Sequence, residues 1–365
     1  MIFAQAFLIS FTIIQCLFYL YLKSGWRKSP TCYHPKKTAP VSIVVAAHNE
    51  AHHLPKLLSA LLAQEYPVFE IVLVLDRCTD NSLEVLKAFQ DAPHLLVIEI
   101  DETSAGFSGK KYALHKGIEA AKYELLAFTD ADCVPRSNQW LKHVSTAFGP
   151  DTAIAIGYSP YQRFPGLLNR LIRYETITVA LQYFSMAQLG HPYMGVGRNM
   201  AYRKTFYTTK RGFGQFSATT GGDDDLFISH HATSSNINSY YSVDSFVDTI
   251  PKQTWRSWFK QKQRHLSVGK HYRKSHQLIL SLLSASQIGF WLTFVILAAV
   301  EAVLLSLVLC YLCRIICLML FFGKGLRKLG DNFEWWWIPV LDVIYTTYLM
   351  TIGPVGYFTK RVKWS

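Results

Sequence analysis

The stretch "LLAFTDADCVP" (Leu125–Pro135) decides the fold class. Its apolar start, Leu125–Phe128, reads as a buried strand of a mainly parallel sheet, and the strand ends in two carboxylates, Asp130 and Asp132. Side chains at positions i and i+2 of a strand point the same way, with Cα atoms roughly 6.5 Å apart. The two charges therefore repel each other unless a cation or a set of donors lies between them. The alternative interpretation is a plain strand-to-loop turn, because Asp favours turns and Pro135 follows.

The first apolar segment, Ile2–Leu22, carries no charge and has about the 20 residues that a helix needs to cross a bilayer. A secretory signal would place positive charge before such a segment, whereas here the positive residues follow it. They are Lys23, Arg27, Lys28, Lys36 and Lys37. We therefore expect an uncleaved anchor, and the positive-inside rule predicts that the residues after it are cytoplasmic.

A second apolar region, Leu278–Phe322, contains only Glu301 and Arg314 as charges and is long enough for two spans. The polar break Gly323–Glu334 separates it from Trp335–Phe358, which either crosses the membrane, re-enters it or lies in the interface.

These segments predict three regions in the chain of 365 residues: a transmembrane anchor (1–22), a cytoplasmic domain (23–276) and a C-terminal membrane region of two or three helices (277–365). We expect an integral membrane protein with a cytoplasmic catalytic domain, located in the plasma or inner membrane if the source is bacterial. The net charge of +12 suits a membrane surface, and no nucleic-acid motif accompanies it. The seven cysteines show no zinc-binding spacing in the soluble part.

Strand and helix patterns alternate between Val41 and Thr129, which predicts an α/β fold with a parallel sheet and right-handed crossovers. The expected strands are 41–50, 69–76, 94–101 and 125–129, and the expected helices are 51–64, 83–89 and 109–122. Ligands of such sheets bind at the carboxyl ends of the strands.

Polar residues gather at that edge of the predicted sheet. A site of carboxylates beside a basic helix N-terminus suits a nucleotide diphosphate that is held partly through a divalent metal. The residues concerned are Ala47-His48-Asn49-Glu50, Asp76, Asp130, Asp132, Lys110 and Lys111.

Residues from about Val41 to His276 resemble the inverting glycosyltransferases of family 2, which have the GT-A fold. The resemblance is carried by "VSIVVAAHNE" (Val41–Glu50), "VLDRCTDNS" (Val74–Ser82) and the D-x-D strand that opens this section. It implies a nucleotide-sugar-binding sheet flanked by helices, a UDP-sugar donor, and Mg²⁺ or Mn²⁺ as cofactor. The metal would neutralise the two aspartates and stabilise the charge on the departing UDP.

The resemblance also implies roles for single residues. Asp76 would contact the uracil end of the nucleotide, although Leu75 stands where many relatives have a further Asp. Asp130 and Asp132 would be the metal pair, with Asp132 as the direct ligand. The implied nucleotide-binding residues are Ala46, Ala47, Asn49, Glu50, Asp76, Lys110, Asp130 and Arg264.

The stretch "TTGGDDDLFISHH" (Thr219–His231) offers a catalytic base, which an inverting transfer needs for the acceptor hydroxyl. It resembles the acidic pair of the family, in which a leucine follows the base by three residues, so Leu226 selects Asp223. An alignment as Gly-Asp-Asp selects Asp224 instead, and both remain candidates. Crowded carboxylates raise one another's pKa, which suits a base. The alternative interpretation is a helix N-terminus, where Asp is favoured.

The basic, tryptophan-bearing segment Gln253–Lys274 predicts an interfacial amphipathic helix. Within it, "QKQRH" (Gln261–His265) resembles the Q-x-x-R-W motif of processive and lipid-acceptor members. The resemblance places Arg264 on the diphosphate and Gln261 in the acceptor site, where His265 replaces the usual Trp. The stretch "GVGRNMAYRK" (Gly195–Lys204) resembles an acceptor-side segment and receives no specific role.

The sequence thus predicts a hexosyltransferase-type enzyme that transfers a sugar from a nucleotide sugar, with UDP as the nucleotide, to a lipid or membrane-associated glycan acceptor. Two alternatives stay open: a processive polysaccharide synthase and a non-catalytic, nucleotide-binding membrane subunit. The second should have lost one of the acidic sites, and all of them are present.

Overall fold

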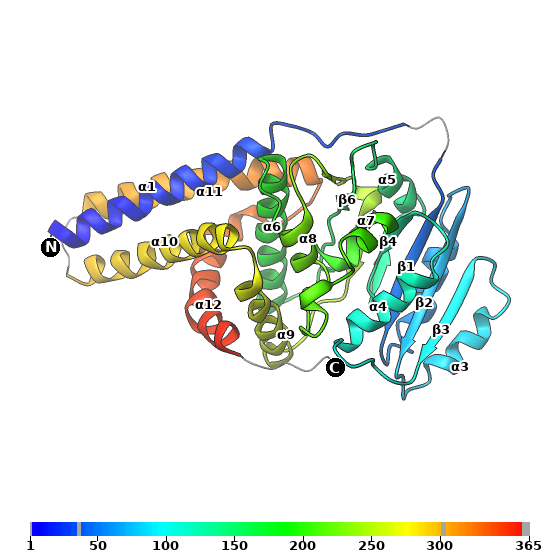
Figure 1. The fold of residues 1–365 in the computed structure, drawn as a ribbon. Helices are drawn as coiled ribbons and strands as arrows, with labels where there is room; N and C mark the ends of the chain where they lie inside the picture. The colour runs from blue at the N-terminus through cyan, green and yellow to red at the C-terminus, as the bar shows by residue number, and fades with distance from the viewer. Residues whose placement is uncertain (1, 35–37, 301–303, 360–365) are drawn as a thin grey trace. The chain divides into compact units, whose positions relative to one another are not determined.

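The computed structural model describes residues 2–34, 38–300 and 304–359, which form two compact units (Figure 1). The sheet unit comprises Ser29–Gln162 and Gly190–Pro251. The helix unit comprises Met1–Lys28, Arg163–Leu189 and Lys252–Thr359.

The sheet unit is built on a sheet whose described strands have the order β3-β2-β1-β4-β7-β6-β8. The predicted parallel α/β core is confirmed, because the first four strands in the chain pair in parallel. They are β1 (Val41–Ala47), β2 (Phe69–Asp76), β3 (Leu95–Ile100) and β4 (Leu125–Phe128). Beyond β4 the sheet is mixed, because β7 (Met200–Arg203) runs antiparallel to both β4 and β6 (Ile154–Ile156), while β8 (Ile237–Ser239) is parallel to β6. A two-stranded sheet of β5 (Cys133–Pro135) and β9 (Val247–Thr249) follows the D-x-D turn.

Short helices complete the sheet unit. They are α2 (Leu54–Leu62), α3 (Ser82–Leu86), α4 (Gly109–Ala120), α5 (Trp140–Thr146), α7 (Lys204–Thr209) and α8 (Asp225–His231).

The two faces of the sheet are covered by different helices because side chains alternate along each strand. Ile43 and Leu73 share a buried core with apolar residues of α2 and α5. Val44 and Val74 point to the opposite face, where they contact Gly117 of α4. A Cβ atom at position 117 would lie 2.6 Å from Cγ1 of Val44, so only glycine permits this close packing.

The helix unit contains α1 (Ile2–Gly25), α6 (Leu167–Gln188), α9 (Trp255–Val268), α10 (Lys274–Ala299), α11 (Leu304–Leu329) and α12 (Ile338–Phe358). Among the described residues, four helical segments are long and apolar enough to cross a membrane: α1, α10, α11 and Trp335–Phe358. Helix α1 lies along α10 and α11 (Figure 1).

Arg314 and Asp342, the described charges inside the apolar stretches Leu278–Phe322 and Trp335–Phe358, are paired with each other. Nη1 of Arg314 in α11 lies 2.7 Å from Oδ2 of Asp342 in α12, and Nη2 lies 3.0 Å from Oδ1. Gln287 and Trp291 of α10 donate to the same carboxylate at 3.3 and 3.2 Å. Both charged side chains are almost fully buried, so this pair connects α11 to α12 and does not line an open channel. Glu301 lies outside the described residues.

The predicted interfacial helix corresponds to α9, which packs on its own unit through part of its surface. Trp258 is 1% exposed and lies 5.1 Å, ring to ring, from Tyr348 of α12. Lys262 forms a buried ion pair with Glu175 of α6. Trp255 and Phe259 are exposed.

Candidate functional site

Lys110 joins the two acidic motifs that the sequence singled out. Its Nζ atom, at the N-terminal end of α4, lies 2.8 Å from Oδ1 of Asp130 and 2.9 Å from Oδ2 of Asp223. Burial lowers the pKa of Lys110, but the two carboxylates outweigh it and the net pKa is raised. An ammonium group therefore holds the D-x-D turn and the Asp223–Asp225 run together.

The D-x-D turn presents a set of possible metal ligands. One ligand atom each of Asp130, Asp132 and Cys133 lies within 4.8 Å of the others. Carboxylate oxygens suit Mg²⁺ and Mn²⁺, whereas a thiol suits softer metals. Burial raises the pKa of Cys133, and its Sγ atom donates to Oδ1 of Asp132 at 3.2 Å. The chemistry of the set therefore fits a hard divalent cation on the two aspartates, with Cys133 as a protonated neighbour.

The three consecutive aspartates are not equivalent. Asp224 accepts hydrogen bonds from the backbone N–H of Gly197 at 2.7 Å and of Asp225 at 2.8 Å, and it is the N-cap residue of α8. Asp223 instead faces Lys110.

Their pKa values shift in opposite directions. Burial raises the pKa of Asp223, but the adjacent Lys110 outweighs it, so the net pKa is lowered. Burial and then the charge of Asp223 raise the pKa of Asp224. The expected mutual rise of the pKa values thus holds for Asp224 alone.

The cavity at this point is small. Lys110, Asp130, Gly197, Tyr202 and Asp223 are among the residues that line about 10 Å³, which is room for roughly one water molecule. Lys110 fills the space between the carboxylates.

The stretch Gly195–Lys204, for which no specific role was predicted, supplies three consecutive residues in or next to the site. Gly197 holds Asp224. Arg198 donates from Nε to Oγ of Ser159 at 2.8 Å and carries a positive charge near Asp130 and Asp132. Asn199 is fully buried and donates to the carbonyl of Tyr158 at 2.6 Å. The available signal in the sequence was the polar pair Arg198-Asn199, which follows Gly197 and directly precedes the apolar start of a strand.

Lys111 was expected to face the nucleotide edge, but its side chain has a different role. It is fully buried, and Nζ donates to the backbone carbonyls of Phe216 at 2.7 Å and Thr219 at 2.9 Å. It therefore fixes the loop that leads to Asp223. The lysine pair alone gave no indication of which member would turn inward.

The residues predicted for the base of the nucleotide lie at the ends of β1 and β2. Asp76 is buried and binds the guanidinium of Arg77 at 2.8 Å through both oxygens. Asn49 accepts from the backbone N–H of Thr79 at 2.7 Å, which ties the two strand ends together. Glu50 lies 2.7 Å from His53. Ala46 and Ala47 are buried in β1, and their contact with a nucleotide stays a prediction.

The residues of the "QKQRH" motif belong to α9 of the helix unit. Gln261 and Arg264 are half-buried there, and His265 is exposed. Their proposed roles toward a diphosphate and an acceptor stay predictions.

Comparison with known families decides the class of this protein. The sequence matches "Glycosyl transferase family group 2" over residues 127–326, more than half of the chain, and "Glycosyl transferase family 2" over residues 42–208. The chain belongs to glycosyltransferase family 2. The resemblance carried by the strand ends is thereby confirmed.

Curated relatives of this glycosyltransferase match parts of it. The glycosyltransferase AglE of Haloferax volcanii is 31% identical over 141 residues, which cover 38% of this chain and 45% of the relative. A poly-beta-1,6-N-acetyl-D-glucosamine synthase of Staphylococcus epidermidis is 26% identical over 37% of this chain and 32% of its own length. The probable glycosyltransferase YdaM of Bacillus subtilis is 24% identical over 71% of this chain and 64% of its own length. The glycosyltransferase thus spans less than half of the first two relatives.

A solved mannosyltransferase of Pyrobaculum calidifontis, in complex with GDP-Man and Mn²⁺, has a similar structure. It covers 91% of the glycosyltransferase and 100% of its own chain, with a TM-score of 0.61 at 19% identity. The similarity supports the expected GT-A fold.

Proposed function

We propose that this glycosyltransferase transfers a sugar from a nucleotide-diphosphate sugar to a hydroxyl group of a membrane-associated acceptor, with inversion at the anomeric carbon. The observation that carries the proposal is the convergence of the D-x-D turn and Asp223 on the single ammonium group of Lys110. A donor diphosphate and an acceptor base are needed side by side in such a reaction, and these residues are suited to both.

Asp130 and Asp132 would hold Mg²⁺ or Mn²⁺ against the diphosphate. When bound, the metal stabilises the negative charge that grows on the leaving diphosphate. The hard oxygen donors of the turn support this assignment. The Mn²⁺ in the complex of the Pyrobaculum mannosyltransferase supports it as well.

Asp223 is the proposed base, because its carboxylate lines the cavity beside Asp130, whereas Asp224 is occupied by the backbone of Gly197 and by the start of α8. The acceptor oxygen forms a bond to the anomeric carbon while the bond from that carbon to the diphosphate oxygen breaks. The electron pair of the broken bond leaves with the diphosphate, and the hydroxyl proton passes to Asp223. A single displacement of this kind inverts the anomeric centre.

Lys110 exchanges partners in this proposal. Without a donor it neutralises Asp130 and Asp223 and fills the cavity. A donor diphosphate supplies further negative charge, which attracts the ammonium group away from Asp223 and frees that carboxylate for the acceptor. Asp223 then becomes more basic, because the charge that lowers its pKa has moved.

The proposed product is an acceptor that carries one or a few added sugars. Arg314 and Asp342 are paired and buried, so they do not supply a polar lining for the export of a polymer.

A processive polysaccharide synthase is the second candidate, favoured by the similarity to the staphylococcal synthase. Membranes containing the protein are supplied with labelled nucleotide sugar, and products are separated by size and solvent partition. We expect the label in organic-extractable material, and label in a large water-soluble polymer would select the synthase instead.

The donor is tested by screening the purified full chain against UDP- and GDP-sugars, with release of the free nucleoside diphosphate as the readout. We expect turnover with UDP-sugars. Preference for a GDP-sugar would correct the nucleotide, and binding without turnover of any donor in the presence of acceptor lipids would indicate the non-catalytic subunit.

A further inference from the structure

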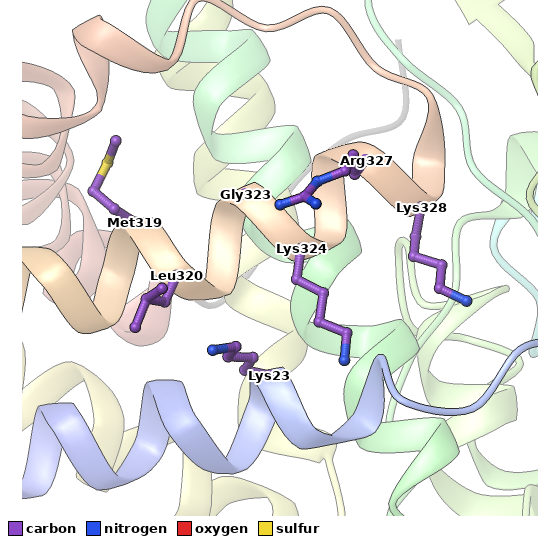
Figure 2. Close-up of a pocket in the computed structure, with 7 residues that line it drawn as sticks. All are labelled: Lys23, Met319, Leu320, Gly323, Lys324, Arg327 and Lys328. Carbon is purple, nitrogen blue, oxygen red and sulfur yellow. The ribbon is translucent and has the colours of Figure 1, made fainter.

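A pocket of about 500 Å³ lies in the helix unit, between the C-terminal ends of α1 and α11, and takes no part in the proposed transfer (Figure 2). Four of its lining residues are cationic: Lys23 from α1, and Lys324, Arg327 and Lys328 from α11. No acidic residue among the described ones lines it. Figure 2 shows the side chains of Lys23 and Lys324 between the two helices.

The floor of the pocket is apolar. Met319 and Leu320 precede the basic residues on α11, and Gly323 leaves open space where a side chain would otherwise project. Toward the middle of the same helices the outer surface is apolar as well, with Leu320 45% and Ile316 55% exposed on α11 and Leu17 63% exposed on α1. A ligand that fits this surface has an anionic end and an apolar body.

We infer that this pocket binds an anionic phospholipid, with the phosphate of the headgroup between Lys23 and Lys324 and the acyl chains along α1 and α11. The pocket volume falls within the usual range for small-molecule sites. Basic pockets between transmembrane helices bind lipid headgroups by charge attraction and hydrogen bonds to phosphate oxygens. The apolar floor selects a lipid over a free phosphate.

General effects explain in part why cations lie at the ends of α1 and α11, but they do not explain the pocket. Cations near helix C-termini are favoured by the helix dipole, and positive residues flank membrane spans on the cytoplasmic side. Neither effect requires two helices to leave a cavity of this size between their charges, or a glycine at position 323 where a side chain would fill it.

The first test measures lipid binding to the detergent-purified full chain by native mass spectrometry. The probes are short-chain phosphatidylglycerol, short-chain phosphatidylcholine and inorganic phosphate as a competitor. We expect phosphatidylglycerol to bind more tightly than phosphatidylcholine. The double variant Lys23→Gln, Lys324→Gln should weaken phosphatidylglycerol binding by about fivefold for each lysine, or roughly 25-fold for the pair.

Two further variants separate the pocket from general charge attraction. Arg273→Gln, Lys274→Gln removes two exposed charges at the start of α10, which do not line the pocket, and should leave binding unchanged. Gly323→Leu keeps all four cations, meets no atom within 4 Å at its Cβ, and favours the helix, so it should fold and still block the pocket.

Unchanged binding in both pocket variants would overturn the inference, as would an equal loss in the Arg273, Lys274 control. Full displacement of the lipid by inorganic phosphate at the same concentration would show a site for free anions instead. Sugar transfer is not the readout, so failure of the proposed function and failure of this inference are distinguishable.

Discussion

The Nζ atom of Lys111 lies 2.7 Å from the carbonyl oxygen of Phe216, and this hydrogen bond ties the first turn of α4 to the loop before Asp223. A second bond, to the carbonyl of Thr219 at 2.9 Å, holds the same loop one turn further on. The neighbouring Lys110 contacts Asp223 directly. Two adjacent lysines thus hold the acidic run in different ways. Lys111 binds backbone carbonyls of the loop before Asp223, and Lys110 pairs with the Asp223 carboxylate.

Replacing Lys111 with Met should lower stability and turnover together. Two buried carbonyls would lose their donor, at a cost of about 1–3 kcal/mol each, and the loop that positions Asp223 would loosen. We expect kcat to fall while KM for the donor changes little, measured by steady-state kinetics beside thermal unfolding. Lys116→Met, on an exposed face of the same helix, is the control. Full kcat in a destabilised Lys111→Met protein would contradict the positioning role.

Replacing Lys110 with Met should change the pH dependence of the reaction. The lowered pKa of Asp223 keeps it ionised in the folded protein, and its stabilising contribution is lost only as pH falls through that lowered value. Without Lys110, the burial that raises the pKa of Asp223 is opposed only by the lesser effects of the Lys111 charge and a backbone hydrogen bond. The acid limb of the kcat/KM profile should therefore move to higher pH, in addition to a loss of rate. An acid limb at the wild-type position would mean that Asp223 is not the group that titrates.

Asp132→Asn should remove the metal dependence of nucleotide binding. The neutral amide is a poor substitute for a carboxylate ligand, so UDP affinity should no longer rise when Mn²⁺ is added, as measured by calorimetry. Cys133→Ser is the matched control, since the thiol stays protonated and donates to Asp132. A normal rise of affinity with Mn²⁺ in Asp132→Asn would refute the assignment.

Asp223→Asn and Asp224→Asn should differ in kind. The first removes the proposed base, so turnover should fall by about 10²-fold or more while UDP affinity survives. The second keeps an acceptor oxygen for the backbone of Gly197 or Asp225, and the loss of turnover should be smaller. Single-turnover rates with saturating donor make the comparison, and the reverse order of effects would move the base to Asp224.

The ion pair of Arg314 and Asp342 should be sensitive to the loss of one partner. Asp342→Asn leaves a buried guanidinium without its counter-charge, which costs roughly 3–5 kcal/mol. The double variant Arg314→Leu, Asp342→Leu removes both charges and should be less damaging than the single one. Thermal unfolding in detergent tests the order, and a single variant as stable as the wild type would mean that water reaches the pair.

The sequence was sufficient for the parts of the fold that follow a local period. Strand and helix patterns alternate without interruption up to Thr129, so the parallel pairing of the first strands and the placement of Asp130 and Lys110 at the same sheet edge could be predicted. The pairing of β7 with β4 could not, because 71 residues of chain, including α6 of the helix unit, separate them.

Two details of the site depend on geometry that no period reveals. Arg77 adopts a positive φ of 49° directly after β2, and it pairs with the preceding Asp76. Lys111 turns inward while Lys110 faces the carboxylates, although both begin the same helix. Tertiary contacts determine the direction of each side chain. For Lys111 they are hydrogen bonds to the carbonyls of a loop about a hundred residues away in the chain.

The close contact of Gly117 with Val44 sets how near α4 approaches the sheet. Lys110 lies two turns earlier on the same rigid helix, about 10 Å along its axis. A larger residue at position 117 would push the middle of α4 away from the sheet. The first turn of the helix would then tilt and move the Lys110 ammonium group away from Asp130 and Asp223. The distance of the Lys110 ammonium group from the two carboxylates therefore depends on an apolar contact two turns away, and a larger residue at position 117 would require a smaller one at position 44.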